Sequence, residues 1–269
     1  MDIWQALILG LVEGITEYLP VSSTGHLLIA QRWLGIEASR AANAYAIVIQ
    51  AGAILAVLGL YRQRVGAVAL GLLGRHDSGR RLLVALLVAF VPAAVIGFLL
   101  DDPIERLLFG PWPVVAAWAA GGVLLLALGQ RIQARGGHVL EELRPAAALW
   151  IGLAQCAALW PGVSRSMATI LGGVAVGLSL SAAVEFSFLL GLLTLGAATS
   201  YKALSSGTLL LQTYGALPLV VGFLAAWVSA TLAVRWMVGW LQRRGLTLFG
   251  WWRLAAAGIV AAWLLTAGG

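Results

Sequence analysis

Six long apolar runs constrain this chain more than any other feature. They cover residues 45–61, 82–100, 113–129, 183–200, 214–234 and 251–267. Each run is close to the roughly 20 residues that a helix needs to cross a bilayer. The sequence is 61% hydrophobic and 10% charged, whereas soluble domains carry about a quarter charged residues. It therefore predicts an all-α polytopic membrane protein with six transmembrane helices.

Four shorter apolar segments do not fit this scheme. Residues 2–19, 27–34, 146–160 and 166–177 are too short or too polar to cross the bilayer. Broken backbone is tolerated at membrane depth only where protein surrounds it, because its polar groups have no water to bind. We therefore expect two re-entrant helix hairpins, one from the first two segments and one from the last two.

The two hairpins belong to an internal repeat. Gly10-Leu-Val-Glu13 in the first half recurs as Gly152-Leu-Ala-Gln155 in the second. Leu108-Phe-Gly110 likewise recurs as Leu248-Phe-Gly250. Since the two pairs are separated by nearly the same length of chain, we infer a duplication.

The duplication divides the chain into three parts. Residues 1–129 form a first repeat, residues 130–145 a cytoplasmic linker and residues 146–269 a second repeat, and each repeat has one hairpin and three crossings. Because three is an odd number, the second repeat must be inverted in the membrane. The hairpins then enter from opposite faces and can meet near the midplane.

The basic residues indicate the orientation. Arginines gather in the segments 62–81, 131–144 and 235–244, which the predicted topology puts on one side of the membrane. That side is cytoplasmic by the positive-inside rule, so both termini are expected to be external. The net charge of +6 follows from these loops, and no nucleic-acid partner is expected. The single cysteine, Cys156, excludes an internal disulfide and a cysteine-based metal site.

The first predicted hairpin carries costly polar groups at its break. Glu13 and Glu17 are four residues apart, so a helix places both on one face. Pro20 ends that helix. The hydroxyls of Ser22, Ser23 and Thr24 can cap a second helix, with Gly25 and His26 in its first turn. Ionisable groups inside a membrane are functional candidates, and free N–H groups at a helix start favour an anion.

The second hairpin breaks at Pro161 and offers a positive charge. Ser164 can cap the next helix, and Arg165 lies in its first turn, followed by Ser166 and Thr169. Within a membrane this arginine needs an anionic partner. If the two helix starts converge, the site suits a phosphate or diphosphate. The nearby glutamates would repel such an anion unless a divalent cation, Mg²⁺ or Ca²⁺, bridges them.

Two segments carry a family resemblance. Glu13-Gly-Ile-Thr-Glu-Tyr-Leu-Pro-Val-Ser-Ser-Thr-Gly-His26 and Pro161-Gly-Val-Ser-Arg-Ser166 resemble the signature segments of the undecaprenyl-diphosphate phosphatase family, also called bacitracin-resistance proteins. Ile49-Gln50 and Glu185-Phe-Ser-Phe-Leu-Leu190 are similar to further family positions, and the similarity covers essentially the whole chain. One departure is Met167, where the family usually has glycine. We expect this larger side chain to narrow the pocket or to change the backbone approach.

The resemblance implies an integral enzyme of the bacterial inner (plasma) membrane. It would remove one phosphate from undecaprenyl diphosphate, recycle the lipid carrier of cell-wall peptidoglycan synthesis and confer bacitracin resistance. Divalent-cation dependence and a site open to the outer face are also implied. The expected partners are a polyprenyl diphosphate substrate and membrane lipids, and a homodimer stays open.

These features give each candidate residue a predicted role. Ser23 is the nucleophile, His26 is the base and then the acid, and Arg165 neutralises charge on the phosphoryl oxygens. Glu17, backed by Glu13, holds the metal or orients His26. The remaining diphosphate ligands are Ser22, Thr24, Gly25, Ser164, Ser166 and Thr169.

Several alternatives stay open. Water activated by His26 or Glu17 is an alternative nucleophile. Glu185 is either a buried structural acid or the partner of a base such as Arg165, and Thr169 is equally compatible with a bond to its own backbone. A polyprenyl-phosphate flippase or an ion-coupled transporter would use the same inverted repeat.

Overall fold

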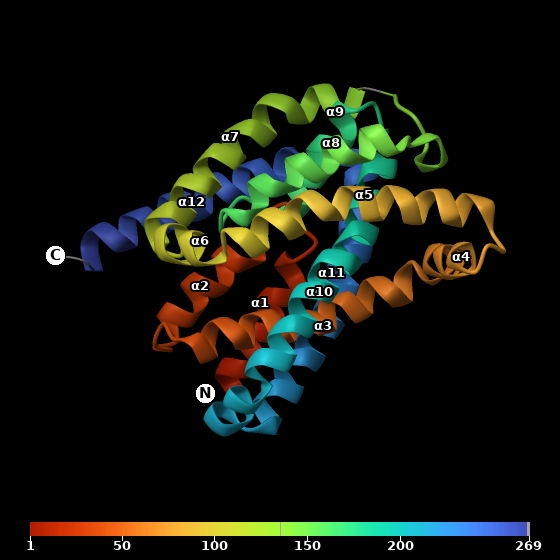
Figure 1. Cartoon of the computed structure of the whole chain (residues 1–269). Coiled ribbons are helices and arrows are strands. Elements are labelled where there is room, and N and C mark those ends of the chain that lie inside the picture. The colour runs from red at the N-terminus through yellow and green to blue at the C-terminus, as the bar shows by residue number, and fades with distance from the viewer. Residues whose placement is uncertain (135, 268–269) are drawn as a thin grey trace.

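The fold is built from helices that cross one another around a buried centre (Figure 1). The computed structural model describes residues 1–134 and 136–267. Residue 135 of the predicted linker and residues 268–269 of the predicted second repeat lie outside the described residues. Within them, the only β-type pairing is an isolated bridge between His138 and Leu178. The all-α fold class is thus confirmed.

Six helices of the described chain are long and apolar enough to cross a membrane, and they confirm the six predicted spans. They are α3 (Arg40–Leu60), α5 (Asp77–Leu99), α7 (Pro111–Ala134), α10 (Leu180–Tyr214), α11 (Ala216–Arg244) and α12 (Thr247–Ala267). Helix α10 continues well beyond Ser200, the predicted end of its apolar run, and stops only at Gly215, whose φ is +78°. Helix α7 likewise continues into the predicted linker.

Four shorter helices occupy the segments predicted as hairpins. They are α1 (Ile3–Thr16), α2 (Ser23–Trp33), α8 (Pro145–Cys156) and α9 (Arg165–Ala175). A 3₁₀ turn, η2 (Ala157–Leu159), follows α8. Three helical segments lie in the loops, outside the predicted spans and hairpins: α4 (Arg62–Leu72), α6 (Asp101–Leu108) and the 3₁₀ turn η1 (Leu140–Glu142).

Each half of the chain packs a short helix against a long helix of the other half. Helix α1 lies along α11, and α8 lies along α5. Glycines that correspond in the sequence repeat allow both approaches, because a side chain at Gly10 would overlap Gly222 and a side chain at Gly152 would overlap Ala89. The halves are therefore interlocked through their short helices.

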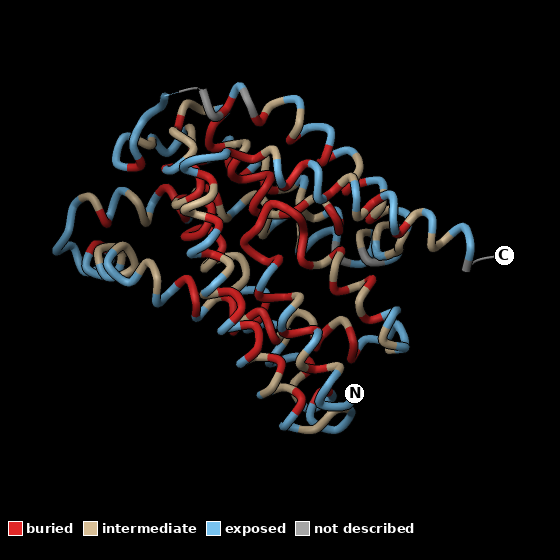
Figure 2. Tube along the Cα trace, turned by 180° about the vertical axis from the view of Figure 1, so that it is seen from behind, coloured by how far each residue is buried: buried red, intermediate tan, exposed pale blue. Residues whose placement is uncertain are grey.

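The buried residues concentrate where the short helices break, at the centre of the molecule in Figure 2. The largest side chains in this region with less than 2% exposure include Tyr18, Trp118, Phe188 and Arg253. Large apolar side chains such as Phe98 and Leu204 are instead exposed on the outside. This distribution suits a protein whose outer surface faces lipid and whose polar groups face inward.

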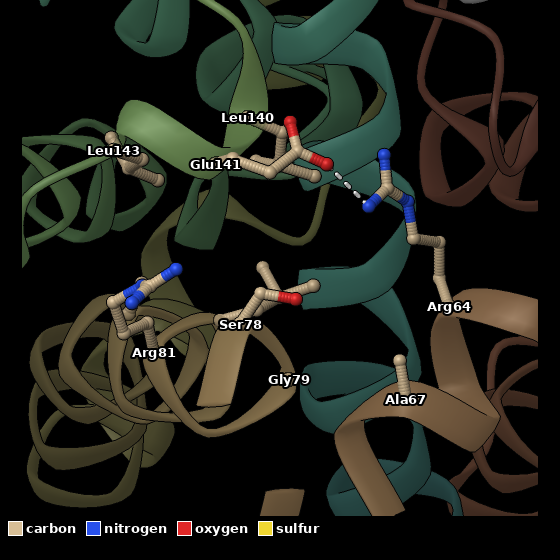
Figure 3. Close-up of a pocket in the computed structure, with 10 residues that line it drawn as sticks. Arg64, Ala67, Ser78, Gly79, Arg81, Leu140, Glu141 and Leu143 are labelled. Atoms are coloured by element: carbon tan, nitrogen blue, oxygen red, sulfur yellow. Dashed lines mark hydrogen bonds and ion pairs between the residues drawn. The ribbon is translucent and has the colours of Figure 1, made fainter. Parts of the chain in front are cut away.

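An ionic cluster joins three segments at one end of the molecule. The Arg64 guanidinium donates to the carboxylate of Glu185 at 2.6 Å and to that of Glu141 at 2.5 Å. Figure 3 shows Arg64 reaching Glu141 beside a small cavity. Glu185 thus pairs with a base, but that base is Arg64 of α4 and not Arg165. The cluster ties α4 to η1 and α10.

This cluster predicts a small pH dependence of stability. The hydrogen bond from Arg64 holds the pKa of Glu141 below its ordinary value. A depressed folded-state pKa stabilises the fold above the ordinary glutamate pKa, and this stabilisation is lost as the pH falls through the lower value. We expect Glu141→Gln to lower the apparent Tm in detergent by at most about 3 °C at pH 6, because the pair is partly exposed, and by less at pH 3. Glu37→Gln, at an exposed position of another loop, is the control, and an equal effect of Glu141→Gln at both pH values would contradict this prediction.

Candidate functional site

The first break lies between α1 and α2 and is held by a strained serine. Ser22 has φ of 72°, a backbone conformation that residues other than glycine rarely adopt. Its hydroxyl accepts the backbone N–H of Gly25 at 3.5 Å and so caps α2. Such backbone strain, of about 1–3 kcal/mol per residue, clusters at active sites and ligand clamps.

The second break repeats this arrangement. Ser164 has φ of 78°, and its hydroxyl accepts the N–H of Met167 at 3.2 Å to cap α9. Ser22 and Ser164 are separated by the same length of chain as Gly10 and Gly152, so they are equivalent positions of the sequence repeat. The predicted caps are therefore both found, each with the same unusual geometry.

Serines of the second break also form hydrogen bonds with the first break. The Ser166 hydroxyl donates to the carbonyl oxygen of Leu19 at 2.8 Å and lies 3.0 Å from the Ser164 hydroxyl. Both serines are buried. The two broken segments, which lie about half a chain apart in the sequence, are in direct contact.

Arg165 reaches across this contact to an acid of α1. Its Nη2 donates to Oε1 of Glu17 at 3.0 Å, and its Nη1 donates to the carbonyl oxygen of Ser187 at 2.9 Å. The guanidinium carbon lies 5.1 Å from the centre of the Tyr18 ring, a cation–π contact. The structure thus brings Arg165 and Glu17 together, as their charges indicated.

The same glutamate is bound to the candidate nucleophile. The Ser23 hydroxyl donates to Oε2 of Glu17, so this carboxylate joins Ser23 to Arg165. Glu13 lies next to Glu17 and is fully buried, and neither of its oxygens has a hydrogen-bond donor. The two acids can bond to each other only if they share a proton.

His26 has other partners than Ser23. Its Nδ1 lies 2.7 Å from the carbonyl oxygen of Ser22, and its Nε2 lies 3.0 Å from the indole nitrogen of Trp252. The ring also packs against Trp118, with 4.6 Å between the ring centres. Ser23, for which His26 was predicted as the base, thus bonds to Glu17 instead, and the imidazole contacts two tryptophans.

A cavity of about 710 Å³ opens beside this cluster. Thr24, Gln155 and Arg165 form polar parts of its wall, and apolar residues of α5 such as Phe90 and Phe98 form another part. Nε of Arg165 and both polar atoms of the Gln155 amide are buried without a partner. Because an unpaired buried donor is unfavourable by about 1–3 kcal/mol, Nε of Arg165 and the amide nitrogen of Gln155 favour a ligand with acceptor oxygens.

The remaining predicted ligands lie around the cavity without lining it. Gly25 packs so closely on Trp118 that a side chain would overlap the indole. The Thr169 hydroxyl donates to the backbone oxygen of Arg165 at 2.9 Å and contacts the Ser187 hydroxyl at 2.6 Å. Met167, the expected source of a narrower pocket, is buried in the main core and lies outside the cavity lining.

One buried arginine in the last helix was missed by the sequence analysis. Arg253 of α12 donates to the carbonyl oxygens of both breaks and of α7. The acceptors are Pro20 at 3.3 Å, Val163 at 3.1 Å, Gly162 at 2.8 Å and Ala117 at 2.8 Å. The available signal was an arginine inside an apolar run, which within a membrane marks a structural or functional partner.

These features define a multi-pass membrane protein with a buried serine–glutamate–arginine cluster, whose arginine lines a partly apolar cavity. The chain belongs to the bacitracin resistance protein BacA family, whose model matches residues 6–260. The family predicted from the two signature segments is thereby confirmed.

Curated relatives cover nearly the whole chain. It is 46% identical to an undecaprenyl-diphosphatase of Sorangium cellulosum, over 97% of this chain and 86% of the relative. It is 44% identical to undecaprenyl-diphosphatase 2 of Rhodospirillum rubrum, over 96% and 93% of the two chains. It is 42% identical to undecaprenyl-diphosphatase 1 of Chromobacterium violaceum, over 96% and 95%.

Proposed function

We propose that this protein hydrolyses undecaprenyl diphosphate to undecaprenyl phosphate and phosphate, and so recycles the lipid carrier of cell-wall synthesis. The names of its relatives support this activity, and the family name supports a role in bacitracin resistance. The observation that carries the proposal is the cluster of Ser23, Glu17 and Arg165, which couples a hydroxyl to an acid and a guanidinium beside the cavity.

The cavity suggests how the substrate binds. The diphosphate would lie against Arg165 and Thr24, where a guanidinium nitrogen lacks a partner, and the prenyl tail would lie along the apolar side chains of α5. The hydroxyls of Ser22 and Ser164 already cap helices, so they would shape the anion-binding N–H groups of α2 and α9. The arrangement would be supported by residues that lie around the cavity without lining it, namely Ser166, Gly25 and Thr169.

The proposed reaction follows from the hydrogen bond between Ser23 and Glu17. Glu17 accepts the proton as the Ser23 oxygen forms a bond to the terminal phosphorus, and the bond from that phosphorus to the bridging oxygen breaks. Undecaprenyl phosphate leaves, and water then hydrolyses the phosphoserine. Arg165 stabilises the charge on the phosphoryl oxygens in both steps. His26 exchanges a proton with the water or the leaving group, and direct attack by water remains the competing route.

Glu13 and Glu17 fit a divalent cation. Glu13 has two buried carboxylate oxygens without a donor and lies beside a second carboxylate, and Mg²⁺ and Ca²⁺ prefer such ligands. Among the described residues, no three or more acidic, histidine or cysteine side chains are placed so that they could hold a metal ion together, so phosphate oxygens and water would complete the coordination. When bound, the ion would reduce the repulsion between these acids and the substrate.

The arrangement in the membrane is part of the proposal. Two observations support an inverted repeat with two re-entrant hairpins. Ser22 and Ser164 have the same strained backbone at equivalent positions, and each half packs its short helix against a long helix of the other half. With the basic segments cytoplasmic, both termini are external and the cavity takes substrate from the outer leaflet of the bacterial inner membrane. The division at residues 129 and 146 and a homodimer remain predictions.

One assay tests both the activity and the metal. Purified protein in detergent should release phosphate from a polyprenyl diphosphate, a chelator should lower the rate, and Mg²⁺ or Ca²⁺ should restore it. Glu13→Gln should raise the metal concentration that gives half-maximal rate. No phosphate release under any metal condition would overturn the proposed function, and activity insensitive to chelator would overturn only the metal.

A further inference from the structure

The two hydrogen bonds of His26 determine which of its nitrogens carries the proton. The carbonyl oxygen of Ser22 can only accept, so Nδ1, 2.7 Å away, must be the donor. The indole N–H of Trp252 can only donate, so Nε2, 3.0 Å away, must accept with its lone pair. His26 is therefore neutral, with its proton on Nδ1.

The surroundings of His26 reinforce this state. The rings of Trp252 and His26 lie side by side and nearly parallel, with an angle of 17° between them and 6.1 Å between their centres, and the charged residue next to Trp252 on α12 is Arg253. From α7 the contact is the uncharged Trp118. The titratable groups on the side of α1 are Glu13 and Glu17, and the bonds of Glu17 are to Ser23 and Arg165. A second proton on the imidazole would place an N–H against the indole N–H.

The indole of Trp252 is also placed so that it can move away from His26. Its side chain belongs to a residue that is 54% exposed, whereas Arg253, the next residue, is completely buried. The indole therefore closes Nε2 of His26 from the outside of α12, whereas Arg253 anchors the helix to the two breaks. Rotation of one exposed side chain would open Nε2 without disturbing these anchors.

We propose that Trp252 is a positioning residue that holds His26 in the neutral Nδ1–H tautomer and closes its Nε2 until the indole moves aside. The proposal deepens the function proposed above, because His26 can exchange a proton with water or with the leaving group only after Nε2 is free. It gives α12 a direct part in the reaction cycle.

Chemical modification of the free protein tests this inference without relying on activity. Diethyl pyrocarbonate reacts with a free imidazole lone pair, and peptide mass spectrometry resolves His26 from His76 and His138. We expect Trp252→Phe, which keeps an aromatic ring but removes the donor, to speed modification of His26 severalfold. Trp251→Phe, at the neighbouring exposed tryptophan, is the matched control and should leave the rate unchanged. The His76 rate reports general unfolding.

The pH profile provides a second measurement. Loss of the indole donor makes protonation of His26 easier. Trp252→Phe should therefore shift the acid limb of the pH–rate profile to higher pH, by about 0.5 to 1 unit. Equal modification of His26 in both tryptophan variants and the wild type would overturn the inference even if the enzyme is active. Faster modification in a protein that releases no phosphate would support Trp252 while refuting the proposed function. If Trp252→Phe does not fold, the same two measurements are made on Trp252→Leu, with the same expected results.

Discussion

Replacing Ser23 by alanine is expected to lower the rate of phosphate release by about 1000-fold or more. The substitution removes the nucleophile and leaves Glu17 with one fewer donor, whereas the bond from Arg165 to the other carboxylate oxygen remains. Initial rates with a polyprenyl diphosphate in detergent measure the effect. In the wild type, substrate labelled in its terminal phosphate should transiently label the peptide that contains Ser23.

Ser205 provides the matched control for this experiment. It is an exposed serine of α10 whose hydroxyl bonds only locally, to the backbone oxygen of Lys202. Ser205→Ala should therefore retain the wild-type rate. If Ser23→Ala also retained it, the covalent route would be excluded, and water activated by Glu17 or His26 would be the nucleophile.

Replacing Arg165 by lysine should lower kcat by about 100-fold. Lysine keeps the charge, but its donors all lie on one nitrogen, so it cannot reproduce the planar fork that spans Glu17, the Ser187 carbonyl and the phosphate. Removal of one well-placed donor in other enzymes typically lowers kcat by about 100-fold to 1000-fold. Because the lost stabilisation concerns the transition state, KM should change less than kcat. Steady-state kinetics over a range of substrate concentrations separate the two.

Arg64→Lys is the corresponding control. Arg64 also bonds to two oxygen acceptors, Glu141 and Glu185, but it lies outside the large cavity. Its replacement should change the apparent Tm slightly and leave kcat nearly unaltered. A similar small effect at Arg165 would contradict the role of its guanidinium as a phosphate clamp.

Much of this molecule follows from local rules. The apolar runs predict the six long helices, because bilayer thickness sets the length of such a run. Pro20 and Pro161 mark the two breaks, and the serines that follow them act as caps, because their hydroxyls accept N–H groups that the new helix leaves free. The pairing of Arg165 with Glu17 follows from the requirement that a charge inside a membrane must have a partner.

Other features depend on contacts that no local pattern contains. Ser23 binds Glu17 and not His26, because the break turns the start of α2 back toward the end of α1. Glu185 meets Arg64, which belongs to a loop helix that the apolar pattern did not indicate. The acceptors of Arg253 could not be predicted either, since they lie in distant parts of the chain, from Pro20 near its beginning to Val163 in the second break.

The position of Arg253 has a consequence for the order of biosynthesis. The carbonyl oxygen of Pro20, near the beginning of the chain, receives its bond from a helix that is translated last among those described. Until α12 has inserted, the loop that leads into Ser23 lacks this anchor. A nascent chain stalled before α12 is therefore expected to be inert toward lipid phosphates, which would protect the membrane from an unfinished hydrolase.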